Sequence, residues 1–325
     1  MSKAVVARAI GGPEVLSYED HDPGRPGPGE ILVRQSAAGL NFIDVYFRTG
    51  LYKSETVPFV LGKEGAGTVA EVGEGVSRFK PGDRVAYSAG KGTYAELVLV
   101  PAEQAAALPD AIDFETAAAA MLKGMTAEYL LRRTFPVGPE TTLLFHAAAG
   151  GVGLIAGQWA KHLGATVIGT AGSTEKCELA LANGYDHVIN YRDDDFVERV
   201  KEITGGRKCD VVYDSVGKDT FLKSLDCLKP RGMCVAFGQS SGKVPDFDLG
   251  ILNQKGSLFV TRPSLFGYTL DRREFEESSG ALFDVIASGA VKIRIDQRYP
   301  LEQAAEAHRH LESRATTGAT IFTIA

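Results

Sequence analysis

The sequence predicts an α/β protein with two domains, one doubly wound around a parallel sheet and the other mostly antiparallel and barrel-like. The chain has 325 residues, more than a typical single domain holds. Between residues 141 and 262, apolar runs alternate with helical patterns, as expected for a parallel sheet with helices on both faces. The N-terminal third instead contains short β-like runs separated by Gly and Pro turns, with no helical repeat between them.

Six apolar runs rich in Val, Ile and Phe are the expected strands of the parallel sheet, and six such strands are typical of a dinucleotide-binding fold. The first helix between them places apolar residues on one face from Val152 to Leu163 and ends at Gly164. Ser173 is a good N-cap for the second helix. A third is expected over 194–204, and a fourth over 218–228, ending before Pro230. The expected strands are 141–147, 165–170, 187–191, 209–215, 232–238 and 257–262.

In the first domain we expect strands at 3–10, 30–36, 67–72, 84–87 and 94–100, followed by a bridging helix at 114–132. The tail is expected to return to this domain. It contains a helix at 271–287, a strand at 293–299, a helix at 301–311 and a strand at 319–324. The predicted boundaries are therefore 1–125 and 266–325 for the first domain and 126–265 for the second.

Composition excludes several classes of protein. The formal net charge of −6 does not favour nucleic-acid or anionic-membrane binding. The sequence has no apolar run long enough to span a membrane, and its start lacks the apolar core of a signal peptide. The four cysteines form no CxxC pair. This pattern favours reduced thiols and a cytoplasmic protein.

A glycine-rich turn follows the first expected strand and precedes the first helix, which is the context that a dinucleotide site requires. Gly150 would let the backbone approach a pyrophosphate, and the amides of Gly151 and Val152 would face the phosphates at the helix N-terminus. Gly153 would allow close packing between helix and strand. Ala148 replaces the first glycine of the usual G-x-G-x-x-G pattern, which is a mild departure.

The end of the second strand predicts the type of dinucleotide. An acidic residue there would bind the ribose hydroxyls of NAD, but the strand runs into Gly172 and Ser173, with Lys176 following. Hydroxyl and ammonium groups suit a 2′-phosphate. We therefore expect NADPH rather than NADH, although Lys176 could also be a solvated helix residue.

Several motifs of the chain resemble the zinc-free quinone oxidoreductase (zeta-crystallin-like) branch of the medium-chain dehydrogenase/reductase superfamily, especially its bacterial NADPH-dependent members. The resemblance runs nearly end to end and implies a Rossmann domain plus a GroES-like catalytic domain. It also implies reduction of a quinone by NADPH in an interdomain cleft, by hydride or electron transfer. The motifs are at residues 41–44, 62–69, 72–76, 79–85, 122–127, 158–161 and 252–256.

The residues argue against a catalytic zinc. Zinc alcohol dehydrogenases of this superfamily have a Cys where Asn41 stands and a His where Lys63 stands. A catalytic zinc needs three ligands of Cys, His or carboxylate type, and Lys63 would repel the metal. His308 and His310, the only closely spaced histidines, are two residues apart on an expected helix and cannot share one face. We expect no metal site.

Without a metal, the cofactor must act as the hydride donor and the protein must hold the acceptor. Asn41, Tyr46 and Tyr52 lie in one segment that, by resemblance, lines the cleft. Tyrosine offers a ring to stack on a quinone and a hydroxyl to donate to an oxyanion. Arg262, at the end of the last sheet strand, could add positive charge. Packing roles for the tyrosines and an ion-pair role for Arg262 stay open.

The resemblance implies further cofactor contacts. Tyr191 would cover the adenosine end beside Lys176, and Arg314 would reach across the cleft to the same phosphate. The nicotinamide side would be lined from the bridging helix and from the carboxyl ends of the strands, where ligands of such sheets bind. These lining residues are Tyr129, Ser215, Phe237, Gly238, Ser240 and Ser241.

The sequence leaves two alternative functions open. Related zinc-free reductases reduce the C=C bond of enals and enones, for which Tyr46 or Tyr52 would supply the proton. A non-catalytic NADPH- or RNA-binding role would need a basic patch interspersed with aromatic residues, and the negative net charge opposes such a role.

The last sheet strand, 258–262, leaves an apolar edge. Because such edges are normally covered, we expect a homodimer formed by joining them.

Overall fold

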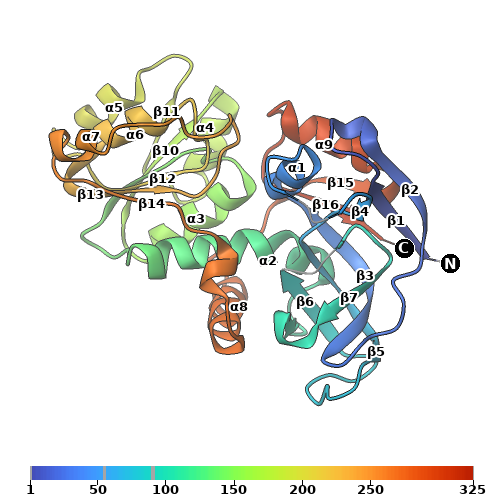
Figure 1. The fold of residues 1–325 in the computed structure, drawn as a ribbon. Coiled ribbons are helices and arrows are strands. Elements are labelled where there is room, and N and C mark those ends of the chain that lie inside the picture. Colours follow the sequence, from blue (N-terminus) through green and yellow to red (C-terminus); the bar gives the residue numbers. More distant parts are fainter. Residues whose placement is uncertain (1, 54–55, 89–91, 325) are drawn as a thin grey trace. The chain divides into compact units, whose positions relative to one another are not determined.

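The computed structural model of the protein describes residues 2–53, 56–88 and 92–324. It divides into two compact units (Figure 1). The first comprises residues 1–125, 269–287 and 293–325, and the second comprises 126–268 and 288–292. Residues 266–268 and 288–292 therefore belong to the second unit, although the sequence assigned them to the first domain. The Gln158 side chain of the second unit binds the second of these segments, since its amide donates to the Lys292 carbonyl at 3.1 Å and its oxygen accepts from the Lys292 N–H at 2.9 Å.

The second unit is built on a six-stranded parallel sheet in the order β11-β10-β9-β12-β13-β14. The chain runs outward from the central β9 to β11, returns to β12 and continues to the other edge, which makes the sheet doubly wound. All six predicted strands are present. Their bounds are β9 Thr142–Phe145, β10 Thr166–Ala171, β11 His187–Asn190, β12 Cys209–Asp214, β13 Leu228–Ala236 and β14 Phe259–Thr261.

Helices on both faces bury this sheet. In Figure 1 the helices α5 and α6 lie above it and α3 lies below. The amphipathic patterns of α5 and α6 place Phe196, Val200, Phe221 and Leu225 in an apolar cluster with the sheet residue Leu144. The helices of this unit are α3 Gly151–His162, α4 Thr174–Leu181, α5 Phe196–Ile203, α6 Phe221–Asp226 and α7 Gly250–Gln254, with the 3-10 turn Leu265–Tyr268.

The fourth helix is shorter than expected. It ends at Asp226, and β13 already begins at Leu228, which pairs with Cys209. The register then shifts, so that the next paired residue is Met233. Pro230 is accommodated because it lies in this irregular stretch, where its missing N–H breaks no regular ladder bond.

The first unit contains a seven-stranded, mostly antiparallel sheet, in which β15-β16-β3-β5-β6-β8 follow one another and β7 pairs with β3, and a three-stranded sheet β2-β1-β4. The tail strand β16 pairs antiparallel with β3, so the C-terminal segment joins this unit as expected. The strands are β1 Ser2–Ala7, β2 Leu16–His21, β3 Glu30–Leu40, β4 Phe59–Val60, β5 Glu64–Val72, β6 Arg84–Ser88, β7 Leu97–Pro101, β8 Ala105–Ala107, β15 Ile295–Pro300 and β16 Ala319–Thr323.

Four helices accompany these strands. Helix α2 runs past the unit boundary at Met125 and continues into a π-helical segment, Leu130–Thr134, so the bridging helix is present near its expected bounds. The short helix α1 was not predicted. No helix in the described parts of the chain is long and apolar enough to cross a membrane. The helices are α1 Phe42–Arg48, α2 Phe114–Tyr129, α8 Arg272–Ala287 and α9 Ala304–Glu312, with 3-10 turns Pro13–Val15, Ala102–Gln104 and Leu301–Gln303.

Candidate nucleotide and acceptor sites

The glycine-rich turn joins β9 to α3 as the sequence predicts. Gly150 is the N-cap of α3, and a methyl group in place of its hydrogen would meet only the Ala147 carbonyl, at 3.2 Å. At Gly153 the same methyl group would come within 2.6 Å of the Ala148 carbonyl. The backbone N–H groups of Gly151 and Val152 belong to the first helical turn, which leaves such groups without intrahelical partners. The turn therefore fits a pyrophosphate.

The next strand end carries the groups expected for a 2′-phosphate. The Ser173 hydroxyl caps α4 by accepting from the Lys176 N–H at 3.3 Å. The Tyr191 hydroxyl lies over Gly172, where an added methyl group would come within 2.5 Å of it. Burial lowers the pKa of Lys176, and the nearby Arg192 lowers it further by repulsion. Two cations that repel each other beside a capped helix N-terminus fit an anionic group.

Arg192 was missed by the sequence analysis. It follows Tyr191 after β11, and the pairing of Ala171 with Asn190 brings this segment to the strand end that precedes Lys176. The sequence did contain one indication of this residue: Arg192 directly follows Tyr191, which was already expected to cover the adenosine end.

The ends of β12 and β13 bring the remaining strand-end residues together. The Phe237 N–H donates to the Asp214 carbonyl at 2.9 Å, and the Ser240 N–H donates to the Ser215 carbonyl at 3.1 Å. The Ser241 hydroxyl donates to the Val216 carbonyl at 2.8 Å. Gly238 packs directly on Ser215, leaving no room for a side chain. The loops after β12 and β13 therefore adjoin each other. They contain the five residues predicted at these strand ends, which are Ser215, Phe237, Gly238, Ser240 and Ser241.

Tyr129 and Arg262 have structural partners in the second unit. The ring of Tyr129 is buried and stacks on Tyr268 with centroids 4.6 Å apart. Arg262 donates through Nη1 to the Ala236 carbonyl at 2.8 Å, at the end of β13. This bond holds the guanidinium at the carboxyl edge of the sheet, where it was expected. Its catalytic role stays a prediction.

In the first unit, Asn41, Tyr46 and Tyr52 gather around α1. Asn41 is the N-cap of this helix, and Tyr46 lies within it and is almost fully buried. The Tyr52 N–H donates to the Tyr46 carbonyl at 2.9 Å, and their rings meet edge to face at 5.2 Å between centroids. The two tyrosines that were predicted to bind the acceptor therefore contact each other.

The residues at the metal positions of the zinc enzymes do not fit a metal. Asn41 Nδ2 donates to Glu64 Oε1 at 2.7 Å, and the ammonium of Lys123 is ion-paired with the same carboxylate. The one carboxylate is thus already neutralised by an ammonium, and Asn41 presents donor hydrogens to it. Within the described residues, no cluster of three His, Cys, Asp or Glu side chains could hold a metal ion.

A series of mostly buried polar side chains links α1 to Tyr94 and α9. The Tyr94 hydroxyl donates to Asp44 Oδ2 at 2.8 Å and lies 3.4 Å from His308 Nε2. Arg48, fully buried, contacts His308 Nδ1 at 2.8 Å and pairs with Glu312 at 2.7 Å. Burial raises the pKa of Asp44 to about 7. Burial, and then the charge of Arg48, lower the pKa of His308 to about 3.

Arg314 follows α9 in the first unit, with a backbone φ of +59°. Its N–H donates to the Leu311 carbonyl at 3.1 Å. Lys176 belongs to the second unit, so the contact of Arg314 with the same phosphate stays a prediction.

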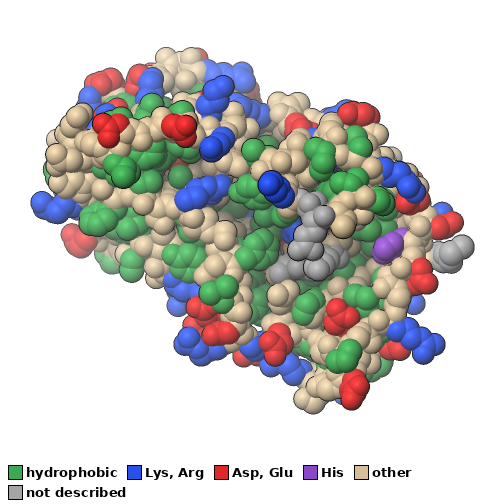
Figure 2. All heavy atoms as spheres, in the orientation of Figure 1, with side chains coloured by type: hydrophobic (Ala, Val, Ile, Leu, Met, Phe, Trp, Pro, Cys, Tyr) green, Lys and Arg blue, Asp and Glu red, His purple; other side chains and the backbone are tan. Residues whose placement is uncertain are grey.

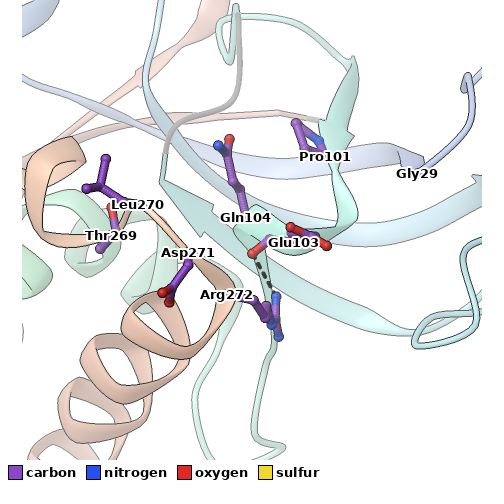
Figure 3. A pocket seen from close by; sticks show the side chains of 8 residues that line it. All are labelled: Gly29, Pro101, Glu103, Gln104, Thr269, Leu270, Asp271 and Arg272. Carbon is purple, nitrogen blue, oxygen red and sulfur yellow. Dashed lines mark hydrogen bonds between the residues drawn. The ribbon is translucent and has the colours of Figure 1, made fainter.

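A pocket of about 270 Å³ lies elsewhere in the first unit (Figure 3). Arg272, one of the charged residues that line it, donates to the carbonyls of Ala102, Glu103 and Ala105 at 3.2, 2.9 and 2.7 Å. The guanidinium therefore fastens α8 to a neighbouring turn. None of the predicted site residues lines the pocket. Its lining is Gly29, Pro101, Glu103, Gln104, Thr269, Leu270, Asp271 and Arg272.

Comparison with known proteins gives a consistent family. Residues 27–110 match the alcohol dehydrogenase GroES-like domain, and residues 151–284 match the zinc-binding dehydrogenase family. The chain is 55% identical to quinone oxidoreductase 1 of Escherichia coli, covering 96% of each chain. It is 46% identical to a 2-haloacrylate reductase of Burkholderia, covering 99% of each. The crystal structure of an Escherichia coli quinone oxidoreductase complexed with NADPH superposes with a TM-score of 0.97 at 53% identity, covering 99% of each chain.

The series of polar side chains that links α1 to Tyr94 and α9 predicts opposing pH effects. Asp44 takes up a proton on folding between its ordinary pKa of 3.8 and about 7, so its contribution to stability falls as the pH rises through that range. His308 releases a proton on folding between about 3 and 6.5, so its contribution rises with pH. The two slopes nearly cancel between pH 4 and 6.5.

We expect Asp44→Asn to expose the His308 slope and His308→Gln to expose the Asp44 slope. The free energy of unfolding, from urea titrations at several pH values, should rise with pH relative to wild type in Asp44→Asn and fall in His308→Gln. Each slope is limited to about 1.4 kcal/mol per pH unit for one proton. Equal pH slopes in the two variants and wild type would contradict the assignment.

Proposed function

The chain belongs to the quinone oxidoreductase family of the medium-chain dehydrogenase/reductase superfamily, and on that premise we propose that it reduces quinones with NADPH without a metal ion. The observation that carries the proposal is the pairing of β10 with β11, which brings Arg192 to the strand end that carries Ser173 and Lys176, where NAD enzymes use an acid. The solved relative complexed with NADPH supports the same cofactor.

The chain's own residues bind NADPH and the quinone and orient them toward each other. When bound, NADPH supplies a hydride, which with one proton converts the quinone to a hydroquinone. The turn at Gly150 and Gly153 receives the pyrophosphate through backbone N–H groups. Asn41, Tyr46 and Tyr52 hold the acceptor and donate hydrogen bonds to the oxygen on which negative charge develops. A quinone suits such a site because its reduced oxygens need little acid assistance.

The experiment that tests this function follows NADPH absorbance with 1,4-benzoquinone or a naphthoquinone as acceptor. We expect rapid oxidation of NADPH with quinones, slower oxidation of NADH, and little turnover with an enal. Turnover with the enal alone would replace quinone reduction by alkene reduction.

Alkene reduction is the second candidate because one relative, at 46% identity, is a 2-haloacrylate reductase. That chemistry adds a proton to the carbon beside the carbonyl group. The Tyr46–Tyr52 pair would be its source. A non-catalytic RNA-binding role has less support, since Lys and Arg side chains are interspersed with Asp and Glu on the face shown in Figure 2.

The coenzyme preference gives a second prediction. Removing the ammonium in Lys176→Ala should raise the KM for NADPH about tenfold or more, since a hydrogen bond between charged groups contributes about 1.5–3 kcal/mol. The KM for NADH should not change, and Arg192→Ala should act in the same direction. Lys201→Ala is the matched control, because Lys201 pairs with Glu198 on the surface of α5. An unchanged NADPH preference would remove Lys176 from the phosphate site.

We also propose a homodimer joined through β14. This strand ends the sheet, pairs with β13 on one side, and exposes 57% of Phe259. An exposed apolar edge of this kind is normally covered. We also propose a cytoplasmic location. The burial of Cys209, Cys227 and Cys234 as free thiols supports this location.

Light scattering tests the dimer. We expect wild-type protein to have twice the chain mass and Phe259→Glu to have the mass of one chain, because a charge on the edge opposes its pairing. Leu270→Glu is the matched control, since Leu270 is 80% exposed but lies in the first unit. A wild-type monomer at working concentration would rule the dimer out.

A further inference from the structure

The carboxylate of Glu64 is enclosed on all sides in the first unit. Glu64 begins β5 and has no exposed surface, and Gly39 of the neighbouring β3 packs so closely on Oε1 that a side chain at that position would collide with it. Three donors surround the carboxylate. They are the ammonium of Lys123, Asn41 Nδ2 at 2.7 Å and the Leu122 N–H at 2.6 Å.

Stability alone is a weak explanation for this arrangement. Lys123 is almost as buried as Glu64, with 6% of its side chain exposed. The cost of desolvating two such charges often equals or exceeds their attraction, so apolar residues of similar volume can serve a fold equally well. The pair is better explained by its effect on the third partner, Asn41.

The ion pair determines which way the Asn41 carboxamide faces. An ionised carboxylate can only accept hydrogen bonds, so Asn41 must turn Nδ2, and not its oxygen, toward Glu64. The backbone of Asn41 is held separately, because its N–H donates to Asp44 Oδ2 at 2.8 Å. The second hydrogen on Nδ2 then has a fixed direction. A protonated Glu64 could instead donate to the Asn41 oxygen, and the carboxamide would be free to turn round.

We propose that Glu64 and Lys123 are positioning residues for the acceptor: they hold Asn41 so that its second N–H donates to the substrate oxygen that becomes negative during reduction. This role rests on the proposed quinone reduction. Lys123 pairs with Glu64, and Glu64 keeps the amide nitrogen in place. A donor oriented before the reaction stabilises the developing charge without having to reorganise.

Two variants test the proposal in the full-length protein. In Lys123→Met, kcat with quinone should fall about tenfold or more near neutral pH, as on loss of one oriented donor. In Glu64→Gln/Lys123→Met, kcat should be equally low, because Gln can face Asn41 in either orientation. The affinity for NADPH, measured by fluorescence titration, should be that of wild type in both.

The double variant is also the control for folding. Because it removes both charges, its melting temperature should be close to that of wild type, whereas Lys123→Met alone should melt lower. A folded double variant with wild-type kcat would overturn the proposal, and so would a folded Lys123→Met variant with wild-type kcat.

Failure of the proposed function would be recognised separately. It would appear as a wild-type enzyme that binds NADPH but does not turn over quinones. In that case, nuclear magnetic resonance of the Asn41 side-chain NH2 group still tests the orientation. We expect one protected and one exchanging proton in wild type and two exchanging protons in the double variant. Equal exchange of both protons in wild type would contradict the fixed orientation.

Discussion

The parallel hydrogen-bond ladder of the second unit is the constraint on which the nucleotide site depends. In a parallel sheet every strand ends at the same edge, so each connection to a helix begins there. This brings the turn at Gly150, the cap at Ser173, Tyr191 and the loops after β12 and β13 to one edge. No long-range contact among these loops is needed to collect them.

A buried polar network fixes that edge from inside. His146, at the end of β9, contacts Thr170 of β10 at 2.8 Å and Ser224 of α6 at 3.0 Å. The Ser224 hydroxyl donates to Asp214 at 2.8 Å, and Asp214 also accepts from the N–H groups of the turn after β12. Burial lowers the pKa of His146, which keeps the ring neutral and able to accept one hydrogen bond and donate another. The network thus joins three adjacent strand ends to one helix.

The sequence predicted the features that are encoded locally. Alternating apolar runs and glycine or proline stops located the six parallel strands, and the glycine turn located the start of α3. Prediction from the sequence failed where tertiary contacts determine the local structure. Helix α1 has only seven residues, too few for a periodic signal, and β13 begins before Pro230 because a register shift accommodates the proline. The neighbourhood of Lys176 and Arg192 depends on the pairing of β10 with β11, which spacing alone does not reveal.

The acceptor side shows the same limit more clearly. Asn41 and Lys63 could be recognised as non-ligands from their types, but Lys123 lies far along the chain in α2 and meets Glu64 only because that helix packs on β3 and β5. The Glu64–Lys123 ion pair is therefore a product of tertiary packing. A metal lowers the barrier by drawing charge from an alcohol oxygen. An ammonium paired with a carboxylate carries no net charge and cannot do this, but it can fix a neutral amide in one orientation. Such a site suits an acceptor that gains electrons readily.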